Sequence, residues 1–135
     1  MTIETYELTK EENFWNSPKP PEFAVISLRR LHGLHVPKNT TPVKVPIIIN
    51  LLKYIWEPSP PHKKIIDPKW TYVCNAFLVH TGNFGGGHFT GYIQSENRVW
   101  YCLDDSIRTR VSVKQVKQEM LQGYMYFYQY VMAAD

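Results

Sequence analysis

FGGGHFTGYIQSENRVWYCLDD, residues 84–105, contains two runs of aromatic and β-branched residues separated by a short polar turn. Runs of this composition, bounded by turn-forming residues, are typical of β-strands. We therefore predict an antiparallel hairpin whose turn is centred on residues 95–97. In that register, His88 on the first strand lies directly opposite Asp104 on the second strand.

Side chains alternate between the two faces of a sheet, so the register also assigns a face to each hairpin residue. One face would carry four opposed pairs: His88 with Asp104, Thr90 with Cys102, Tyr92 with Trp100, and Gln94 with Arg98. The other face would carry Phe89, Gly91, Ile93, Val99, Tyr101 and Leu103, and we expect this apolar face to form the core. Opposed residues have Cβ atoms about 4.5–5.5 Å apart, which lets a carboxylate hydrogen-bond an imidazole and fix its tautomer.

Further strands are predicted on both sides of the hairpin. Residues 23–31, 70–80 and 124–132 have the apolar, β-branched density of strands. Residues 43–55 start extended, although Pro46 argues against a central position in a sheet. These segments extend the hairpin into a larger antiparallel sheet.

Residues 112–123 predict a short helix near the C-terminus. Ser112 suits the N-cap, Gln115 completes a capping box, and Gly123 suits the C-terminal stop. The glycine-rich residues 81–87 predict a flexible loop before the hairpin. Together these elements indicate an α+β fold dominated by antiparallel strands.

Composition bounds the class of protein. We expect a weakly structured lead over residues 1–22 and a single domain over residues 23–132. The chain has 135 residues, of which 44% are hydrophobic and 20% charged, an ordinary balance for one soluble domain. Its formal net charge of +3 is too small to favour nucleic acid or a membrane surface as a partner.

The cellular compartment is predicted from what the sequence lacks. It contains no apolar run of the roughly 18 residues that a membrane helix needs. The N-terminal residues are polar and acidic, unlike a signal peptide. Two cysteines, Cys74 and Cys102, are too few for a disulfide scaffold or a structural zinc site. We therefore expect a cytoplasmic or nuclear protein.

From spacing alone, two interpretations of His88 and Asp104 remain open. They are either a catalytic base with its orienting carboxylate or a structural hydrogen bond across two strands. The glycine run before His88 lacks the Gly-Lys-Ser/Thr ending of a phosphate-binding loop. A metal site built from His80, His88 and Asp104 matches no ligand motif, so we expect neither a metal nor a cofactor.

The same stretch resembles a known family, the ubiquitin-specific proteases, which are deubiquitinases of the Cys-His-Asp/Asn type. GGHFTGYI and RVWYCLDDS are similar to its histidine box, Gly-His-Tyr-x-x-Tyr followed by Trp-Tyr-x-Phe-Asp-Asp-Ser. YVCNAFLVHTG resembles the strand before that box, PEFAVISLRRL the box Pro-x-x-Leu-x-x-x-Leu-Lys-Arg-Phe, and VKVPIIINLLKYI the segment that follows it. SVKQVKQEMLQGYMYFYQY resembles the closing helix and strand, so the resemblance covers residues 21–130. Leu31 replaces the usual phenylalanine, and Gln129 and Tyr130 replace the usual basic pair.

The resemblance implies a fold and roles for individual residues. The fold implied is the palm of a hand-shaped catalytic domain, whose absent thumb would carry the cysteine. His88 matches the general base, Asp104 the carboxylate that orients it, and Asp105 a neighbouring acid that assists in the oxyanion region. The residues that match the segment lying against the Gly-Gly tail of ubiquitin are Gly85, Gly86, Gly87 and Phe89.

The nucleophile of that family has no counterpart in this chain. Its box, Gly-Asn-Thr-Cys-Tyr, is absent. Cys74 lies in the middle of a predicted strand, where a small core residue is expected. Cys102 lies diagonal to His88 in the predicted register, about 7–8 Å away, and we do not expect it to be the nucleophile.

Three functions remain open. The chain is either a catalytically incomplete relative that acts as a protein-interaction module, or part of an active deubiquitinase whose cysteine comes from elsewhere, or an unrelated small α+β binding domain. A sequence that runs from Met1 to MAAD favours the first as a self-contained protein, whereas the presence of both His88 and Asp104 favours the second. The partner would be ubiquitin, a ubiquitin-like protein or a complementing subunit, in a homo- or hetero-oligomer. Aromatic surface at Trp56, Trp70 and residues 124–131 is the expected interface.

Overall fold

The computed structural model of the chain describes residues 20–51, 70–83 and 85–131. Most of the predicted lead over residues 1–22 therefore lies outside the described residues. The elements, in chain order, are β1 (Phe23–Ser27), β2 (Ile48–Asn50), β3 (Thr71–Asn83), β4 (Gly86–Gln94), β5 (Trp100–Asp104), β6 (Ile107–Val111), α2 (Val113–Met120) and β7 (Gly123–Tyr130). No helix in the described ranges is long and apolar enough to cross a membrane.

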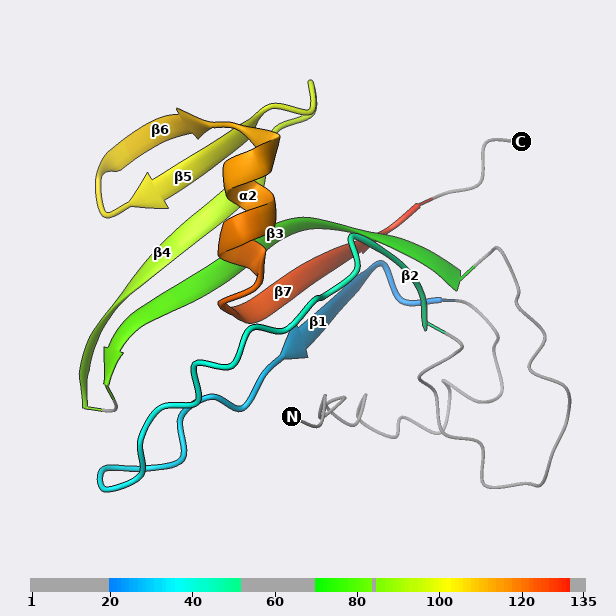
Figure 1. The fold of residues 1–135 in the computed structure, drawn as a ribbon. Helices are drawn as coiled ribbons and strands as arrows, with labels where there is room; N and C mark the ends of the chain where they lie inside the picture. The colour runs from blue at the N-terminus through cyan, green and yellow to red at the C-terminus, as the bar shows by residue number, and fades with distance from the viewer. Residues whose placement is uncertain (1–19, 52–69, 84, 132–135) are drawn as a thin grey trace, which may run out of the picture.

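One antiparallel sheet contains all the strands of the described residues. Its order is β1-β7-β3-β4-β5-β6, and β2 pairs with β3 outside this path. Figure 1 shows the long strand β3 between β4 and β7, with α2 lying across one face of the sheet. The predicted class, an α+β fold of mostly antiparallel strands with a short helix near the C-terminus, is confirmed.

The core lies between the sheet and the two segments that cover one of its faces, α2 and residues 28–51. At its centre the ring of Phe77 stacks on that of Tyr92, with centroids 4.8 Å apart. The same ring lies 5.9 Å from Trp100 and 6.1 Å from Tyr126. Aromatic residues from β3, β4, β5 and β7 thus join the strands into one core.

Helix α2 begins where the sequence predicts. The side chain of Ser112 accepts a hydrogen bond of 3.1 Å from the backbone N–H of Gln115, which satisfies one of the unpaired donors at the helix start. The helix buries Val116 and Met120 in the core. These two side chains place α2 against the core on the face of the sheet that it covers.

The predicted role of Gly123 as a helix stop is wrong. The helix ends at Met120, with Leu121 as a C-cap in the right-handed conformation, and Gly123 is the buried first residue of β7. A Cβ atom at Gly123 would lie 2.2 Å from the hydroxyl oxygen of Tyr126. Glycine is therefore required here to make room for an aromatic ring, not to form a left-handed turn.

The strand predicted over residues 23–31 ends at Ser27, and the fully buried Arg30 follows it. The guanidinium of Arg30 donates hydrogen bonds to four backbone carbonyls: Gly123 at 2.8 Å, Asn39 at 3.1 Å, Thr41 at 2.8 Å and Leu121 at 3.0 Å. These bonds join the segment after β1 to the turn between α2 and β7. A buried cation is stable here because carbonyl oxygens replace its water.

Three other parts of the predicted secondary structure also differ from the observed one. The strand β6 was not predicted, because its sequence IRTRV alternates charged and apolar residues at an exposed edge. The loop predicted over residues 81–87 is mostly strand, since β3 runs to Asn83 and β4 starts at Gly86. Within residues 43–55, only β2 joins the sheet, and residues 52–55 lie outside the described part.

Candidate active site

The register of the β4–β5 hairpin differs from the predicted one by two residues. The observed pairs are Gly91 with Leu103, Tyr92 with Cys102, Ile93 with Tyr101, and Gln94 with Trp100. His88 lies before this ladder begins, and its cross-strand partner is Thr81 of β3. The prediction that His88 pairs directly with Asp104 in the ladder is therefore wrong.

The turn of the hairpin explains the shift. The backbone N–H of Ser95 donates to the carbonyl of Val99, and that of Arg98 donates to the carbonyl of Ser95, each at 2.9 Å. The loop is therefore residues 96–98, one position later than predicted. Arg98 has a φ of 64°, the left-handed conformation that such three-residue loops require and that glycine usually supplies. Moving the centre of a turn by one residue moves the strand register by two.

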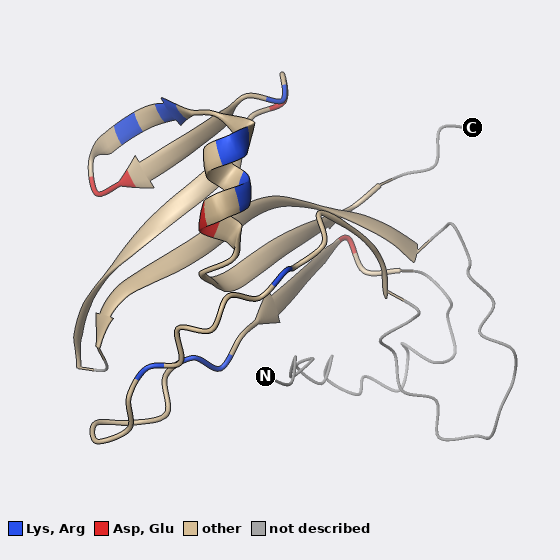
Figure 2. Cartoon of the chain, viewed as in Figure 1, with Lys and Arg blue, Asp and Glu red and all other residues tan. Residues whose placement is uncertain are grey.

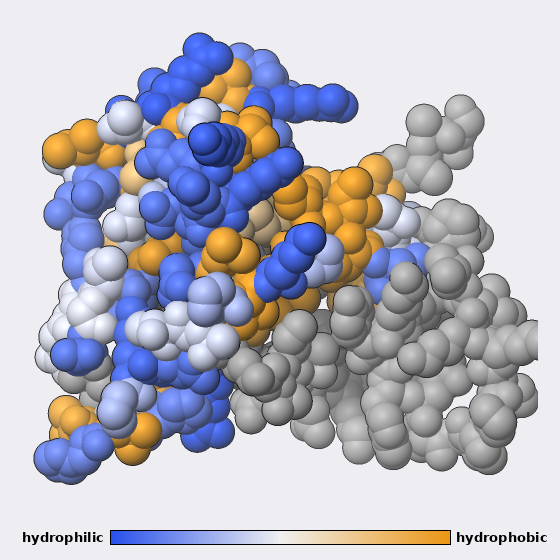
Figure 3. All heavy atoms as spheres, in the orientation of Figure 1, coloured by the Kyte–Doolittle hydropathy of each residue, from blue (hydrophilic) through white to orange (hydrophobic). Residues whose placement is uncertain are grey.

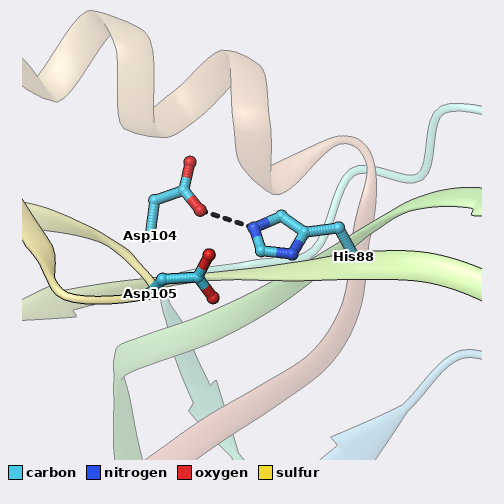
Figure 4. Close-up of side chains that lie close together, drawn as sticks. All are labelled: His88, Asp104 and Asp105. Atoms are coloured by element: carbon cyan, nitrogen blue, oxygen red, sulfur yellow. Dashed lines mark hydrogen bonds and ion pairs between the residues drawn. The ribbon is translucent and has the colours of Figure 1, made fainter.

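The contact between His88 and Asp104 survives this shift. Because side chains repeat their direction every two residues, a shift of two leaves each side chain on its predicted face. Nε2 of His88 lies 2.5 Å from Oδ1 of Asp104 (Figure 4). The prediction that the two side chains come within hydrogen-bond distance is therefore confirmed. Both remain accessible, with exposed side-chain fractions of 45% and 52%.

Electrostatics favour the protonated form of His88. The hydrogen bond that His88 donates to the carboxylate of Asp104 raises the pKa of His88 above its ordinary value, and the charges of Asp104 and Asp105 add to the effect. Asp105 has a φ of 50°, an uncommon conformation for a residue other than glycine, and its side chain lies beside the same imidazole in Figure 4. Asp104 contacts Nε2, so Nδ1 is the ring nitrogen that takes no part in this contact.

Charges around this pair differ in sign. Figure 2 shows acidic residues at the turn between β5 and β6, and basic residues along β6 and α2. The basic residues of these two elements are Arg108, Arg110, Lys114 and Lys117. Arg108 and Arg110 pair with Leu103 and Tyr101, so they lie on the face of the sheet opposite to Asp104.

The hairpin face that is buried is the one that carries His88, and not the one that we predicted. The apolar face that we expected in the core is partly open, since Phe89, Ile93 and Leu103 are 48%, 43% and 38% exposed. The face that carries His88 contains Tyr92 and Trp100, which are only 6% and 5% exposed. The cause is α2, because it covers the face with the larger rings, whereas the other face has no helix over it among the described residues.

Neither cysteine lies in contact with His88. Cys74 is fully buried in β3, as predicted for a small core residue, and burial raises the pKa of its thiol to about 11. Cys102 is half-buried and pairs with Tyr92, not with Thr90 as predicted. The observed register places it farther along the strands from His88 than the predicted one.

The glycine segment, residues 85–87, forms the turn and the start of the strand that leads into His88. Gly85 has a φ of 87° in the turn, and Gly86 and Gly87 are the first residues of β4. Leu34 approaches this turn, since its Cδ2 atom would be 3.3 Å from a Cβ added at Gly85. The predicted tail-binding residues, these three glycines and Phe89, are all exposed.

The metal set considered from the sequence does not assemble. His80 pairs with Phe89 and Thr81 pairs with His88, so His80 and His88 project from opposite faces of the sheet. In the described residues, the possible metal ligands that converge are instead His88, Asp104 and Asp105, whose ligand atoms lie within 4.8 Å of one another. This grouping consists of His88 and the two acidic residues that raise its pKa.

A cavity of about 490 Å³ lies beside the site, between the end of β3, the loop after β1 and the end of α2. Its lining residues include Lys38, His80, Thr81, Glu119 and Gln122. Thr81 donates from its hydroxyl to the carbonyl of His88 at 3.1 Å, and Lys38 donates to the carbonyl of His80. Sequence reasoning found neither Lys38 nor the buried position of His80, because no motif marks them and only the folded chain brings them together.

Comparison with known proteins identifies relatives. The sequence pattern of the family described as ubiquitin carboxyl-terminal hydrolase matches residues 15–128. Human ubiquitin carboxyl-terminal hydrolase 42 is 33% identical over 104 residues, which are 76% of this chain and 7% of that protein. Ubiquitin carboxyl-terminal hydrolase 8 of Arabidopsis thaliana is 30% identical over 111 residues, 80% of this chain and 12% of that protein. The chain thus spans a small part of the length of these relatives.

Solved structures share the fold. The SAGA Ubp8/Sgf11/Sus1/Sgf73 DUB module bound to ubiquitin aldehyde contains a chain that superposes with a TM-score of 0.67 at 20% identity, covering 84% of this chain and 25% of that one. A yeast SAGA DUB module with a mutated Sgf73 subunit gives a TM-score of 0.65 at 20% identity, covering 84% of this chain and 24% of that one. At this level of identity the likeness concerns the fold alone.

Proposed function

This chain belongs to the ubiquitin carboxyl-terminal hydrolase family, and from that premise we propose that it carries the base and the orienting carboxylate of such a hydrolase without a nucleophile, and acts by binding other proteins. The observation that carries the proposal is the accessible contact between His88 and Asp104, with both thiols of the chain placed elsewhere. Family membership also removes the third alternative, an unrelated small binding domain.

The positions of the two cysteines support the proposal that the chain lacks a nucleophile. Attack on a carbonyl needs a thiolate within hydrogen-bond reach of its base. Cys74 is shielded in the core, and its raised pKa keeps it in the neutral thiol form at physiological pH. Cys102 lies opposite Tyr92 in the ladder, away from the end of β4 that holds His88. Hydrolysis by this chain alone would therefore lack its first covalent step.

Binding of a protein partner is supported by the face of the sheet turned away from α2, which we call the outer face. One row of it runs across five strands through residues that pair in succession: Val25, Phe127, Ala76, Ile93 and Tyr101. A second row contains Met125, Leu78, Gly91 and Leu103. Figure 3 shows the other side of the molecule, where hydrophilic residues dominate over β5, β6 and α2. A continuous apolar face with exposed members is typical of a protein interface.

The aromatic residues proposed from the sequence as the interface need correction. Trp70 is buried, as are Tyr126 and Tyr128 of β7, and Trp56 lies outside the described residues. These rings belong to the core because their side chains lie on the face that α2 and residues 28–51 cover. The outer face, with Phe127 as its contribution from β7, replaces them as the expected interface.

Ubiquitin, a ubiquitin-like protein or a complementing subunit is the partner that family membership favours. A second candidate function is an active deubiquitinase completed by a cysteine from another chain or from further sequence of the same protein. The observation that favours it is again His88, since a scaffold alone has no chemical need for a base held by a carboxylate.

A ubiquitin derivative with an electrophilic C-terminus tests the proposal, because it forms a covalent adduct with a thiolate placed beside a bound ubiquitin tail. The pure chain should show no adduct by intact-protein mass spectrometry. An adduct that is lost in both Cys102→Ser and His88→Ala would contradict the proposal and identify Cys102 as the nucleophile. An adduct formed only after adding a second, cysteine-bearing protein would support the second candidate function.

A further inference from the structure

His80 occupies a position on β3 from which it contacts the residue before His88. Its ring is almost fully buried, at 7% exposure, on the face of the sheet opposite to His88. A Cβ atom added at Gly87 would lie 2.3 Å from Nε2 and 2.7 Å from Cε1 of His80. The imidazole therefore fills the space directly under the backbone of Gly87, from which the chain continues to His88.

Neighbouring side chains hold the His80 ring in this place. The ring of Phe89 lies edge-on to it with centroids 4.9 Å apart, and the ring of Tyr124 lies 6.4 Å away. Phe89 and Tyr124 also contact each other at 5.6 Å. From the backbone side, the ammonium of Lys38 donates to the carbonyl of His80. The imidazole thus has little freedom to move away from Gly87.

The burial of His80 carries an energetic cost that an apolar ring would avoid. Its Nδ1 atom is buried and has no hydrogen-bond partner within the described residues. An unpaired buried polar atom destabilises the folded state, because it has lost its hydrogen bonds to water. Burial, together with the charge of Lys38, lowers the pKa of His80 and keeps the ring neutral. A five-membered ring with an unpaired nitrogen is an uncommon choice for a site that only needs apolar filling.

We propose that His80 is a positioning residue, whose ring supports the backbone at Gly87 and so places the imidazole of His88 against Asp104. The support comes through Nε2 and Cε1, the two ring atoms nearest to Gly87. The shape of the ring decides the fit, since a larger ring would push β4 outward and a shorter side chain would leave a gap beneath Gly87.

The reason why His88 needs to be positioned rests on the proposed function, but the test of the role of His80 does not. The chain need not cleave anything, because the readout is the titration of His88 itself, followed by NMR of its imidazole protons in the full chain. The elevation of the His88 pKa reports the contact with Asp104, and Asp105 is the other charged group that faces the ring. A failed search for a ubiquitin partner would leave this measurement unaffected.

Three substitutions of His80 test which ring atoms support the backbone at Gly87. His80→Gln reaches the position of Nε2, whereas His80→Asn reaches only that of Nδ1, and His80→Phe is larger. We expect His80→Gln to keep most of the elevation of the His88 pKa. We expect His80→Asn and His80→Phe to lose most of it, because the backbone at Gly87 shifts in either case.

Met120→Ala is the matched control, since Met120 is a buried core residue of α2, which covers the face of the sheet opposite to His80. It should lower the thermal unfolding midpoint and leave the His88 pKa elevated. Equal His88 pKa values in all three His80 variants and the wild type would overturn the proposal. So would an equal loss of the elevation in Met120→Ala, which would mean that general destabilisation is the cause.

Discussion

Nε2 of His88 lies 2.5 Å from Oδ1 of Asp104, although the two residues are not paired in the ladder that joins β4 and β5. The side chains meet because both project from the same face of the sheet, His88 from the start of β4 and Asp104 from the end of β5. The contact therefore depends on the direction of the side chains more than on the register of the strands.

Removing this carboxylate should change the titration of His88. In Asp104→Asn the pKa of His88 should fall toward its ordinary value, because the hydrogen bond that raises it most is weakened and a charge is lost. NMR titration of the imidazole protons measures this directly. Asp105→Asn is the matched control, and it should produce a smaller fall, since its charge contributes less.

The same shift predicts how stability depends on pH. A histidine whose pKa is raised on folding stabilises the folded state below the pKa of the unfolded chain, and this contribution is lost as the pH rises through the folded pKa. Urea unfolding of wild type and His88→Gln should therefore differ more at pH 5 than at pH 9. A difference that grows with pH would show that the sign of the coupling is wrong.

Arg30 should be among the most sensitive residues for folding. Arg30→Met would leave four backbone carbonyls without their donor, and we expect a loss of at least about 3 kcal/mol in the free energy of unfolding. Lys114→Ala, an exposed substitution on α2, should change it by less than about 0.5 kcal/mol. Similar urea midpoints for the two variants would contradict this account of Arg30.

Substitution by alanine should destabilise the fold at one glycine, Gly123, and leave its stability nearly unchanged at another, Gly86. Gly123→Ala places a methyl group 2.2 Å from the Tyr126 hydroxyl, and overpacking of this kind costs on the order of 3 kcal/mol. At Gly86 a Cβ atom meets nothing within 4 Å, so Gly86→Ala should be close to neutral. Thermal unfolding of both variants distinguishes packing at Gly123 from a general intolerance of alanine in strands.

The outer face should carry binding of a partner. Ile93→Lys puts a charge in its longest row, at an exposed position, and should weaken association, whether with a second copy or with another protein. Val113→Lys, at an exposed apolar residue of α2, should not. Light scattering after size exclusion tests the homomeric form, and pull-down from the native cell tests the heteromeric one. A monomer that recovers no partner would contradict the proposed interface.

The sequence was sufficient to predict the strands other than β6, the helix start and the meeting of His88 with Asp104, because strand periodicity and capping residues act locally. It was not sufficient for the hairpin register, since Arg98 takes the left-handed position at which a glycine would have been the signal. It was also misleading about Gly123. Glycine is required at this position by the ring of Tyr126 and not by the end of the helix. Local patterns carry no information on which ring will fill a distant space.

The prediction of which hairpin face is buried was wrong for a related reason. Both faces carry apolar residues, so hydrophobicity alone could not show which of them α2 would cover. His80 was invisible as a structural partner of Gly87 because the contact crosses two strands and depends on ring size. Family resemblance supplied the expected roles of the site residues, which spacing by itself left open.

Hydrolysis of ubiquitin carrying a fluorogenic C-terminal amide, measured with the pure chain, is the most direct test of the central claim that this chain holds a base and its carboxylate but no nucleophile. The account predicts no fluorescence release above the uncatalysed background, and the same result for the wild type, Cys102→Ser and His88→Ala. Turnover by the wild type that disappears in both variants would contradict it, because it would show that Cys102 and His88 form a complete catalytic pair.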